Sequence, residues 1–272
     1  MSLPVRDPST MRFNTSWRKM AAAIYSRPMD GKVTGFVDID FRPCQKAIEE
    51  WSELGHRVTP LHIMMAIMAR ILGRHVPEMN CYASWGGVHH RGEVVVSSAV
   101  LVGGKDLITL RVRHADQKSV LELADEVNAG VAERRKGNDD KVMKKRGGLA
   151  KLPWPFRQWV FNFIRWLTYE AGIQIPGLGL NRNTFGSVLV TNIGPLGLDN
   201  GFPALMPASN LAFVMGIGRV QLKAMVEDGE VIPMAVIPIT GAFDHRVVDG
   251  AHIGRFAAAM KHYFAHPEEL LT

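Results

Sequence analysis

The residues with the clearest chemical potential lie near the C-terminus, in the run FDHRVVDG from 243 to 250. His245 precedes Asp249 by four residues, where an extended segment meets a predicted helix. Imidazole accepts and returns a proton near neutral pH, so His245 is a candidate general base. Asp249 could orient this ring, pair with a cation or cap the helix that follows. The pair alone does not define a function, because this spacing arises often by chance.

Two other chemistries fit the sequence poorly. His245, Asp249 and His252 could bind a metal, but no further ligand follows at a convincing spacing, so we predict no metal site. The sequence Gly216-Ile217-Gly218 is not a dinucleotide fingerprint, because it lacks a third glycine and no helix is expected after it.

Hydrophobic periodicity predicts an α+β protein with a mixed sheet and flanking helices. We expect helices over 16–27, 42–54, 61–73, 116–136 and 250–265, and strands over 33–41, 93–103, 106–113, 185–191, 211–220 and 231–243. The helix over 61–73 is apolar nearly all round and is expected to be buried. Helices and strands do not alternate regularly enough for a parallel doubly wound sheet.

Local signals refine these elements. Asp40 is expected to cap the helix that starts at Arg42, and Thr59 to cap the next one, with Pro60 in its first turn. Asp228-Gly229 predicts a hairpin turn. The two prolines within 231–243 suggest an irregular or edge strand.

Composition restricts the class of protein. The 272 residues are 47% hydrophobic and 21% charged, which excludes a disordered chain. The N-terminus lacks the apolar stretch of a signal peptide, and no apolar run reaches the ~18 residues of a membrane span. Cys44 and Cys81 have no metal-ligand spacing and cannot form a disulfide framework. A reduced, cytoplasmic protein is the simplest interpretation.

The chain is basic, with a formal charge of +6 and a pI near 9.4. Such a balance favours anionic partners: nucleic acid, anionic lipid or a phosphate-bearing cofactor. No nucleic-acid recognition module accompanies the charge, so we expect no nucleic-acid partner.

The run DHRVVDG resembles the C-terminal signature of the dihydrolipoyl acyltransferase catalytic domains of 2-oxo acid dehydrogenase complexes. Chloramphenicol acetyltransferases and peptide-synthetase condensation domains carry the related HHxxxDG form. Further similar segments follow in the family's order at 16–21, 79–80, 94–116, 186–194, 219–220 and 267–271. Together they span nearly the whole chain except 137–183.

The resemblance implies a chloramphenicol acetyltransferase-like fold, a trimer and active sites at subunit interfaces that receive a coenzyme A (CoA) thioester and an acyl acceptor. By this resemblance His245 takes a proton from the acceptor thiol or hydroxyl. Thr191 aligns with a family serine whose hydroxyl donates to the tetrahedral oxyanion. Asp249 pairs with an arginine of the N-terminal helix, here Arg18, and so fixes the loop that carries the histidine.

The chain departs from the multidomain acyltransferases at its start. The similarity begins within the first twenty residues, so we expect neither a lipoyl nor a subunit-binding domain, and no lipoyl group on this chain. Residues 1–272 then form a single catalytic domain. A lipoyl-bearing protein would act in trans, or the acceptor is a different small molecule. Either a homotrimer or a larger assembly of trimers fits this expectation.

Residues 137–183 are interpreted as an insertion. Lysine and arginine residues crowd its start, and 152–169 (LPWPFRQWVFNFIRWLTY) places aromatic residues at helical spacing. We favour a helix packed on the trimer or along the acyl tunnel. The alternatives are a helix lying in a membrane surface and a lid over a hydrophobic acyl acceptor.

The leading hypothesis is therefore a CoA-dependent acyltransferase with acyl-CoA as a substrate. The alternative is a trimeric scaffold without activity, or a membrane-surface-associated member of the same fold. The intact DHRVVDG run argues against a decayed site.

Overall fold

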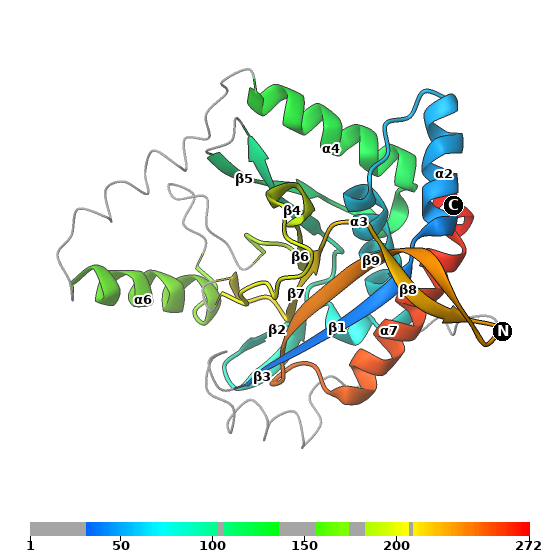
Figure 1. Ribbon diagram of the computed structural model, residues 1–272. Helices are drawn as coiled ribbons and strands as arrows, with labels where there is room; N and C mark the ends of the chain where they lie inside the picture. Colours follow the sequence, from blue (N-terminus) through cyan, green and yellow to red (C-terminus); the bar gives the residue numbers. More distant parts are fainter. Residues whose placement is uncertain (1–30, 103–105, 136–155, 174–182, 207–208) are drawn as a thin grey trace.

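A computed structural model describes residues 31–102, 106–135, 156–173, 183–206 and 209–272. Its centre is a seven-stranded mixed sheet in the order β1-β9-β7-β6-β4-β5, with β8 paired to β9 (Figure 1). The strands are β1 (Lys32–Asp40), β4 (Val96–Val102), β5 (Asp106–Val112), β6 (Val188–Asn192), β7 (Phe213–Ile217), β8 (Gln221–Glu227) and β9 (Glu230–Asp244). A separate hairpin comprises β2 (Cys81–Ser84) and β3 (Gly87–His90).

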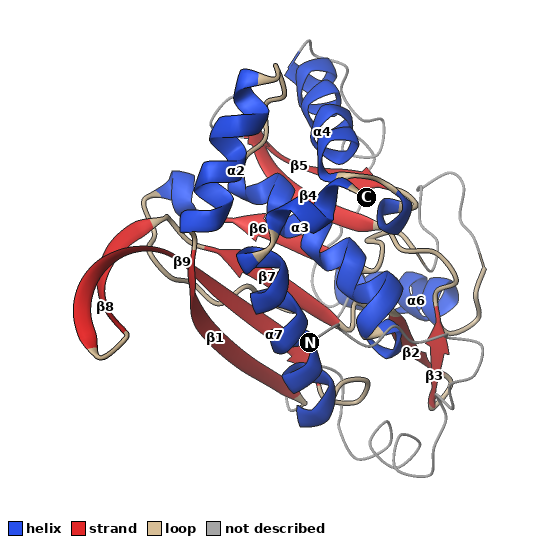
Figure 2. Cartoon of the chain, turned by 90° about the vertical axis from the view of Figure 1, so that its right-hand side faces the viewer, coloured by secondary structure: helices blue, strands red, loops and turns tan. Residues whose placement is uncertain are grey.

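Four helices pack on one face of this sheet (Figure 2). They are α2 (Arg42–Glu53), α3 (Pro60–Arg70), α4 (Val120–Arg135) and α7 (Gly250–Ala265). A fifth, α6 (Phe156–Tyr169), extends away from the sheet. The predicted α+β architecture is confirmed, and so is each predicted helix except 16–27, which lies outside the described residues. None of the described helices has the length and apolarity needed to cross a membrane.

Helix α3 forms the middle of the core, as its sequence predicted. Every residue from His62 to Arg70 is buried. At its end the Arg70 guanidinium donates to the backbone carbonyls of Asp116, Lys118 and Thr272. A buried guanidinium is very unfavourable without hydrogen-bond acceptors, and these carbonyls supply them. The same bonds hold the residues just before α4 and the C-terminal residue against the core helix.

The two expected caps are corrected. Phe41, not Asp40, is the N-cap residue of α2, and no side chain caps it. The Asp40 carboxylate accepts instead from the Arg42 backbone N–H at 3.0 Å and from its guanidinium. Thr59 is the N-cap residue of α3 but makes no side-chain cap bond, whereas Pro60 occupies the first turn as expected. In both helices the proline sets the start of the helix without a capping hydrogen bond.

The expected edge position of 231–243 is also wrong, since β9 lies inside the sheet between β1 and β7. Its prolines are tolerated for local reasons. Pro233 lies beyond Val236, the last residue of β9 that pairs with β1. The N–H that proline lacks is therefore not needed for a hydrogen bond to β1. Strand β9 pairs with β8 and then with β7, and the register shifts by one residue between the two. At this bulge the Pro238 carbonyl accepts from the Gly218 N–H at 2.9 Å. Bulges and strand ends are where a sheet accepts proline.

Both cysteines are buried and neither forms a disulfide. The Cys44 thiol lies 3.4 Å from the Phe264 carbonyl. Burial raises the pKa of Cys44 to about 12, so it stays a thiol at neutral pH.

His62 gives the core a pH dependence. Burial lowers the pKa of His62 to about 4, below the 6.5 of an exposed histidine. As the pH falls from 6.5 to 4, His62 becomes protonated in the unfolded chain but stays neutral in the folded chain. The folded state therefore loses stability in that pH window. We expect the free energy of unfolding to fall by about 2–3 kcal/mol between pH 7 and pH 4.5 from this residue.

Urea unfolding of wild type and His62→Leu at both pH values measures this contribution. The variant should lose less stability on acidification than the wild type. Met64→Leu, a buried change on the same helix without a titrating group, should keep the wild-type difference. Parallel pH curves for wild type and His62→Leu would contradict the assignment.

Candidate active site

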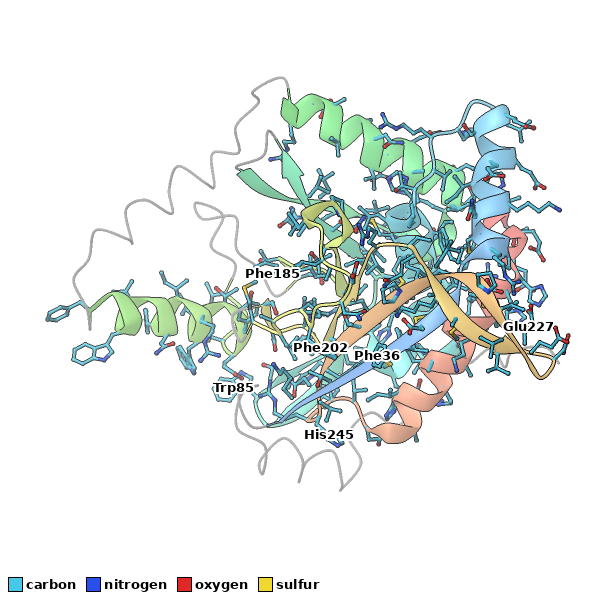
Figure 3. The ribbon with its side chains drawn as sticks, in the orientation of Figure 1. Phe36, Trp85, Phe185, Phe202, Glu227 and His245 are labelled. Carbon is cyan, nitrogen blue, oxygen red and sulfur yellow. The ribbon has the colours of Figure 1, made fainter. Side chains whose placement is uncertain are left out.

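His245 lies in the turn that joins β9 to α7, one residue after the end of the strand. Its side chain is half-buried, and its backbone N–H donates to the Gly31 carbonyl at 2.7 Å. The Asp244 backbone N–H donates to Ala212 at 2.8 Å, so both residues are held by backbone bonds to neighbouring segments. Figure 3 shows His245 and Glu227 at opposite ends of the long β8–β9 arm.

A buried ion pair closes this turn. The Arg246 guanidinium binds both oxygens of the Asp244 carboxylate, with the shortest contact at 2.6 Å, and the Arg246 backbone N–H donates to the same carboxylate at 3.0 Å. The two side chains are only 12% and 4% exposed. The residues on either side of His245 are thereby locked together, which restricts the backbone that carries the ring.

The Asp244–Arg246 pair was not predicted from the sequence. The available signal was two opposite charges spaced by two residues directly after an apolar strand. A charged side chain that follows a buried strand is itself partly buried, and a buried charge needs a partner of opposite charge.

Asp249 is the N-cap residue of α7, as one of its predicted roles required. Its carboxylate accepts from the backbone N–H groups of Ala251 and His252, and the His252 ring lies 2.6 Å from the same oxygen. The arrangement is a capping box. The other predicted role, the pair with Arg18, lies outside the described residues.

Thr191 lies on β6, on the face of the sheet away from the helices. We call this the open face. Val188 and Val190 of β6 point into the helix-covered core, and Leu189 packs in a separate cluster with Leu205 and Leu211. Because side chains alternate along a strand, Thr191 shares the face of Leu189.

The strand register extends this position into a row across the open face. Thr191 pairs with Gly216 of β7, Gly216 with Thr240 of β9, and Thr240 with Phe36 of β1. The Thr240 hydroxyl donates to the Gly201 carbonyl at 2.7 Å, which holds the chain after β6 against the sheet. A Cβ at Gly216 would lie 2.7 Å from that hydroxyl, so only glycine fits there.

The same register separates the two predicted catalytic groups. His245 follows Thr240 by five residues along β9, and Thr191 lies two strands to the side. At ~3.3 Å per residue and ~4.8 Å per strand, the two residues are roughly 15–20 Å apart within one chain. One chain therefore does not bring His245 and Thr191 to a single reacting atom.

The described residues contain no group of three or more His, Cys, Asp or Glu side chains suited to a metal ion. The structure leaves the two predicted groups at separate positions of the chain: an imidazole held by a locked turn, and a hydroxyl on the open face. That combination is typical of acyl transfer, which needs a general base and an oxyanion donor.

Comparison with known proteins confirms the resemblance inferred from the motifs. Residues 178–272 match the family model of the 2-oxoacid dehydrogenases acyltransferase (catalytic domain), and this stretch contains Thr191, His245 and Asp249. The chain is 28% identical to the dihydrolipoyllysine-residue acetyltransferase component of the pyruvate dehydrogenase complex of Staphylococcus epidermidis. The alignment covers 99% of this chain and 54% of the length of that protein. The chain is 27% identical to the Rickettsia felis counterpart, and that alignment covers 71% of this chain and 37% of the length of the counterpart. It thus spans about two fifths of the length of that relative.

Solved structures establish the fold. The cubic core of the pyruvate dehydrogenase multienzyme complex superposes with a TM-score of 0.63 at 18% identity, covering 100% of both chains. The Azotobacter vinelandii dihydrolipoamide acetyltransferase gives 0.62 at 20% identity, covering 89% of this chain and 84% of that one. A chloramphenicol acetyltransferase gives 0.52 at 12% identity, again over 100% of both chains. The predicted chloramphenicol acetyltransferase-like fold is confirmed.

The turn that carries His245 should depend on its ion pair. Arg246→Met leaves the buried Asp244 carboxylate without its guanidinium, and we expect the free energy of unfolding to fall by about 3–5 kcal/mol. A matched control is Arg219→Met, because Arg219 binds Asp199 at 3.0 Å but both side chains are more than half exposed. That variant should lose at most about 1 kcal/mol. Equal losses in urea unfolding would show that the Asp244–Arg246 pair does not stabilise the fold.

Proposed function

We propose that this protein is an acyltransferase that moves an acyl group between CoA and a thiol or another small acceptor. The supporting observation is the locked turn that holds a half-buried His245 within the segment that matches the acyltransferase family. The relatives are named as acetyltransferase components of pyruvate dehydrogenase complexes.

In this proposal the His245 imidazole removes the proton of the acceptor thiol or hydroxyl. The freed sulfur or oxygen attacks the thioester carbonyl, and the resulting oxyanion accepts a hydrogen bond from the Thr191 hydroxyl. Collapse of the tetrahedral intermediate breaks the carbon–sulfur bond to CoA. The departing CoA sulfur then takes the proton back from the imidazolium, which returns His245 to its starting state.

The separation of the two residues supports an active site shared between copies of the chain. His245 of one copy would meet Thr191 of a neighbour in a homotrimer, alone or within a larger assembly of trimers. The open face suits such contacts, because Phe36 and Phe202 are both exposed there. Exposed apolar side chains gathered on one sheet face are typical of interfaces.

Several further parts of the proposal come from the resemblance. Residues 1–272 form one catalytic domain with an insertion at 137–183, and Arg18 pairs with Asp249 to fix the His245 loop. The acceptor is a dihydrolipoyl group on another protein or a small molecule of similar chemistry. The proposed location is the cytoplasm, in keeping with Cys44 and Cys81, which are buried and form no disulfide.

His245→Ala should abolish transfer, because a positioned general base contributes about 10²–10⁴-fold to the rate. Release of free CoA from acetyl-CoA in the presence of dihydrolipoamide measures it. His262→Ala is the control, since His262 binds Glu269 on the surface at 3.0 Å and has no part in the proposed chemistry. Wild-type turnover in the His245→Ala variant would refute the assignment. A folded wild type that neither turns over nor binds CoA would point to the scaffold instead.

Mixed oligomers test whether the site is shared. His245→Ala and Thr191→Ala chains should each be inactive, and Thr191→Ala alone should lose about 10²–10³-fold. In trimers assembled from equal amounts of the two, about a quarter of the sites receive both intact residues, so about a quarter of wild-type activity should return. If His245 and Thr191 acted within one chain, mixing would restore nothing.

A further inference from the structure

Helix α6 carries a stripe of exposed aromatic side chains. Trp159 and Phe163 are 63% and 61% exposed, and Phe156, Val160 and Trp166 are exposed beside them. These residues recur at intervals of three and four, so they lie on one side of the helix. Ring contacts join them in pairs, Phe156 with Trp159 at 5.6 Å and Phe163 with Trp166 at 6.2 Å between centroids.

Among the described residues, the contacts that hold this stripe lie at the C-terminal end of the helix. Thr168 and Tyr169 are buried, and the Ser84 hydroxyl donates to the Tyr169 carbonyl at 2.9 Å. The earlier turns of the helix extend clear of the sheet in Figure 1. In the part of the chain that the structure describes, the helix is thus held at its C-terminal end and its aromatic side is exposed.

Trp85 extends the stripe from a second element. It lies in the two-residue turn between β2 and β3, is 67% exposed, and its ring contacts Trp166 edge-on at 6.4 Å. Its backbone N–H donates to the Glu170 carboxylate at 2.7 Å, and its indole N–H to the Glu170 carbonyl. The polar atom of the indole is therefore bound within the protein, and the apolar ring faces outward (Figure 3).

The backbone at Trp85 is unfavourable for such a residue. Trp85 and Gly86 have φ values of 48° and 68°, a turn that prefers Asn-Gly or Asp-Gly. The β8–β9 hairpin shows the usual solution, Asp228-Gly229, at 51° and 86°. A tryptophan held in left-handed geometry beside an exposed aromatic stripe indicates that its outward ring has a use.

The charge around the stripe identifies the occupant. Between residues 141 and 169 the sequence has seven lysines and arginines and no aspartate or glutamate. Two of these basic residues, Arg157 and Arg165, are in α6 itself. Just outside this range, Asp139 and Asp140 precede it and Glu170 follows it, so the segment keeps a clear excess of basic charge. Tryptophan and phenylalanine on one side of a helix, with an excess of basic charge nearby, is the composition of helices that lie in an anionic lipid surface. With 14 residues the helix is about 21 Å long, too short to cross the ~30 Å hydrocarbon core.

We propose that α6 and Trp85 form a docking surface for an anionic lipid membrane. The aromatic rings enter the headgroup region, and the basic residues of α6, Arg157 and Arg165, bind the lipid phosphates. This inference is independent of the proposed acyl transfer, since it uses neither His245 nor Thr191.

Flotation of the full chain with vesicles tests the proposal. The wild type should float with phosphatidylcholine vesicles that contain about 30% phosphatidylglycerol and much less with phosphatidylcholine alone. Raising the salt to about 1 M should weaken binding, because part of the attraction is screened. Failure of the wild type to float with either vesicle would overturn the proposal.

Two variants separate the contributions. Trp159→Ser/Phe163→Ser should reduce partitioning by about tenfold or more, because it removes the rings that enter the lipid. Arg157→Glu/Arg165→Glu should abolish the preference for the anionic vesicles. The matched control is Leu54→Ser/Leu222→Ser, which removes two exposed apolar side chains, one just after α2 and one on β8. Both elements lie far from α6 (Figure 1).

Flotation of Trp159→Ser/Phe163→Ser at wild-type levels, with its fold verified by circular dichroism, would refute the role of the stripe. Equal losses in the control pair would do the same. A drop in molar mass by light scattering in this variant, without a change in flotation, would assign the stripe to a contact between copies of the chain instead.

Discussion

The pairing of β9 with β7 is the constraint on which the rest of the molecule depends. It sets Thr240 opposite Gly216, and through Gly216 it fixes Thr191 on the open face. It also determines where β9 ends and hence where His245 enters its turn. A slip of one residue would move every side chain of the strand to the other face, so the bond from Thr240 to the Gly201 carbonyl stabilises the register as well as the loop.

The close packing of the chain after β6 follows from the same constraint. A Cβ at Gly218 would lie 1.9 Å from the Asp199 carbonyl oxygen, so the loop can cross the end of β7 only because glycine is there. The open face beside Thr191 therefore has a fixed wall made from the chain's own backbone. With His245 roughly 15–20 Å away along the sheet, the chain supplies two fixed halves of a site and not one complete site.

Sequence patterns predicted the elements whose signals are local. Periodicity predicted α2, α3, α4, α6 and α7, and the charge and small residues after Asp249 predicted its cap. The interior position of β9 could not be predicted, because its prolines are accommodated by where β1 ends and where the β7–β8 bulge lies. The pairing of Asp244 with Arg246 was also missed, since burial decides whether such a pair matters and burial depends on tertiary contacts.

Charge distinguishes the two exposed apolar surfaces of this protein. Near Phe36 on the open face, Asp38 binds Lys223 at 2.8 Å, so these two charges are paired within the chain. Such a surface can be covered by another protein without leaving a charge unpaired. The stripe on α6 differs, because the surrounding sequence has an excess of basic residues, and its nearest acidic residue, Glu170, already binds Trp85. A protein partner would have to provide all the compensating charge, whereas an anionic bilayer provides it at every point of contact, which favours lipid on α6 and a second copy of the chain on the sheet.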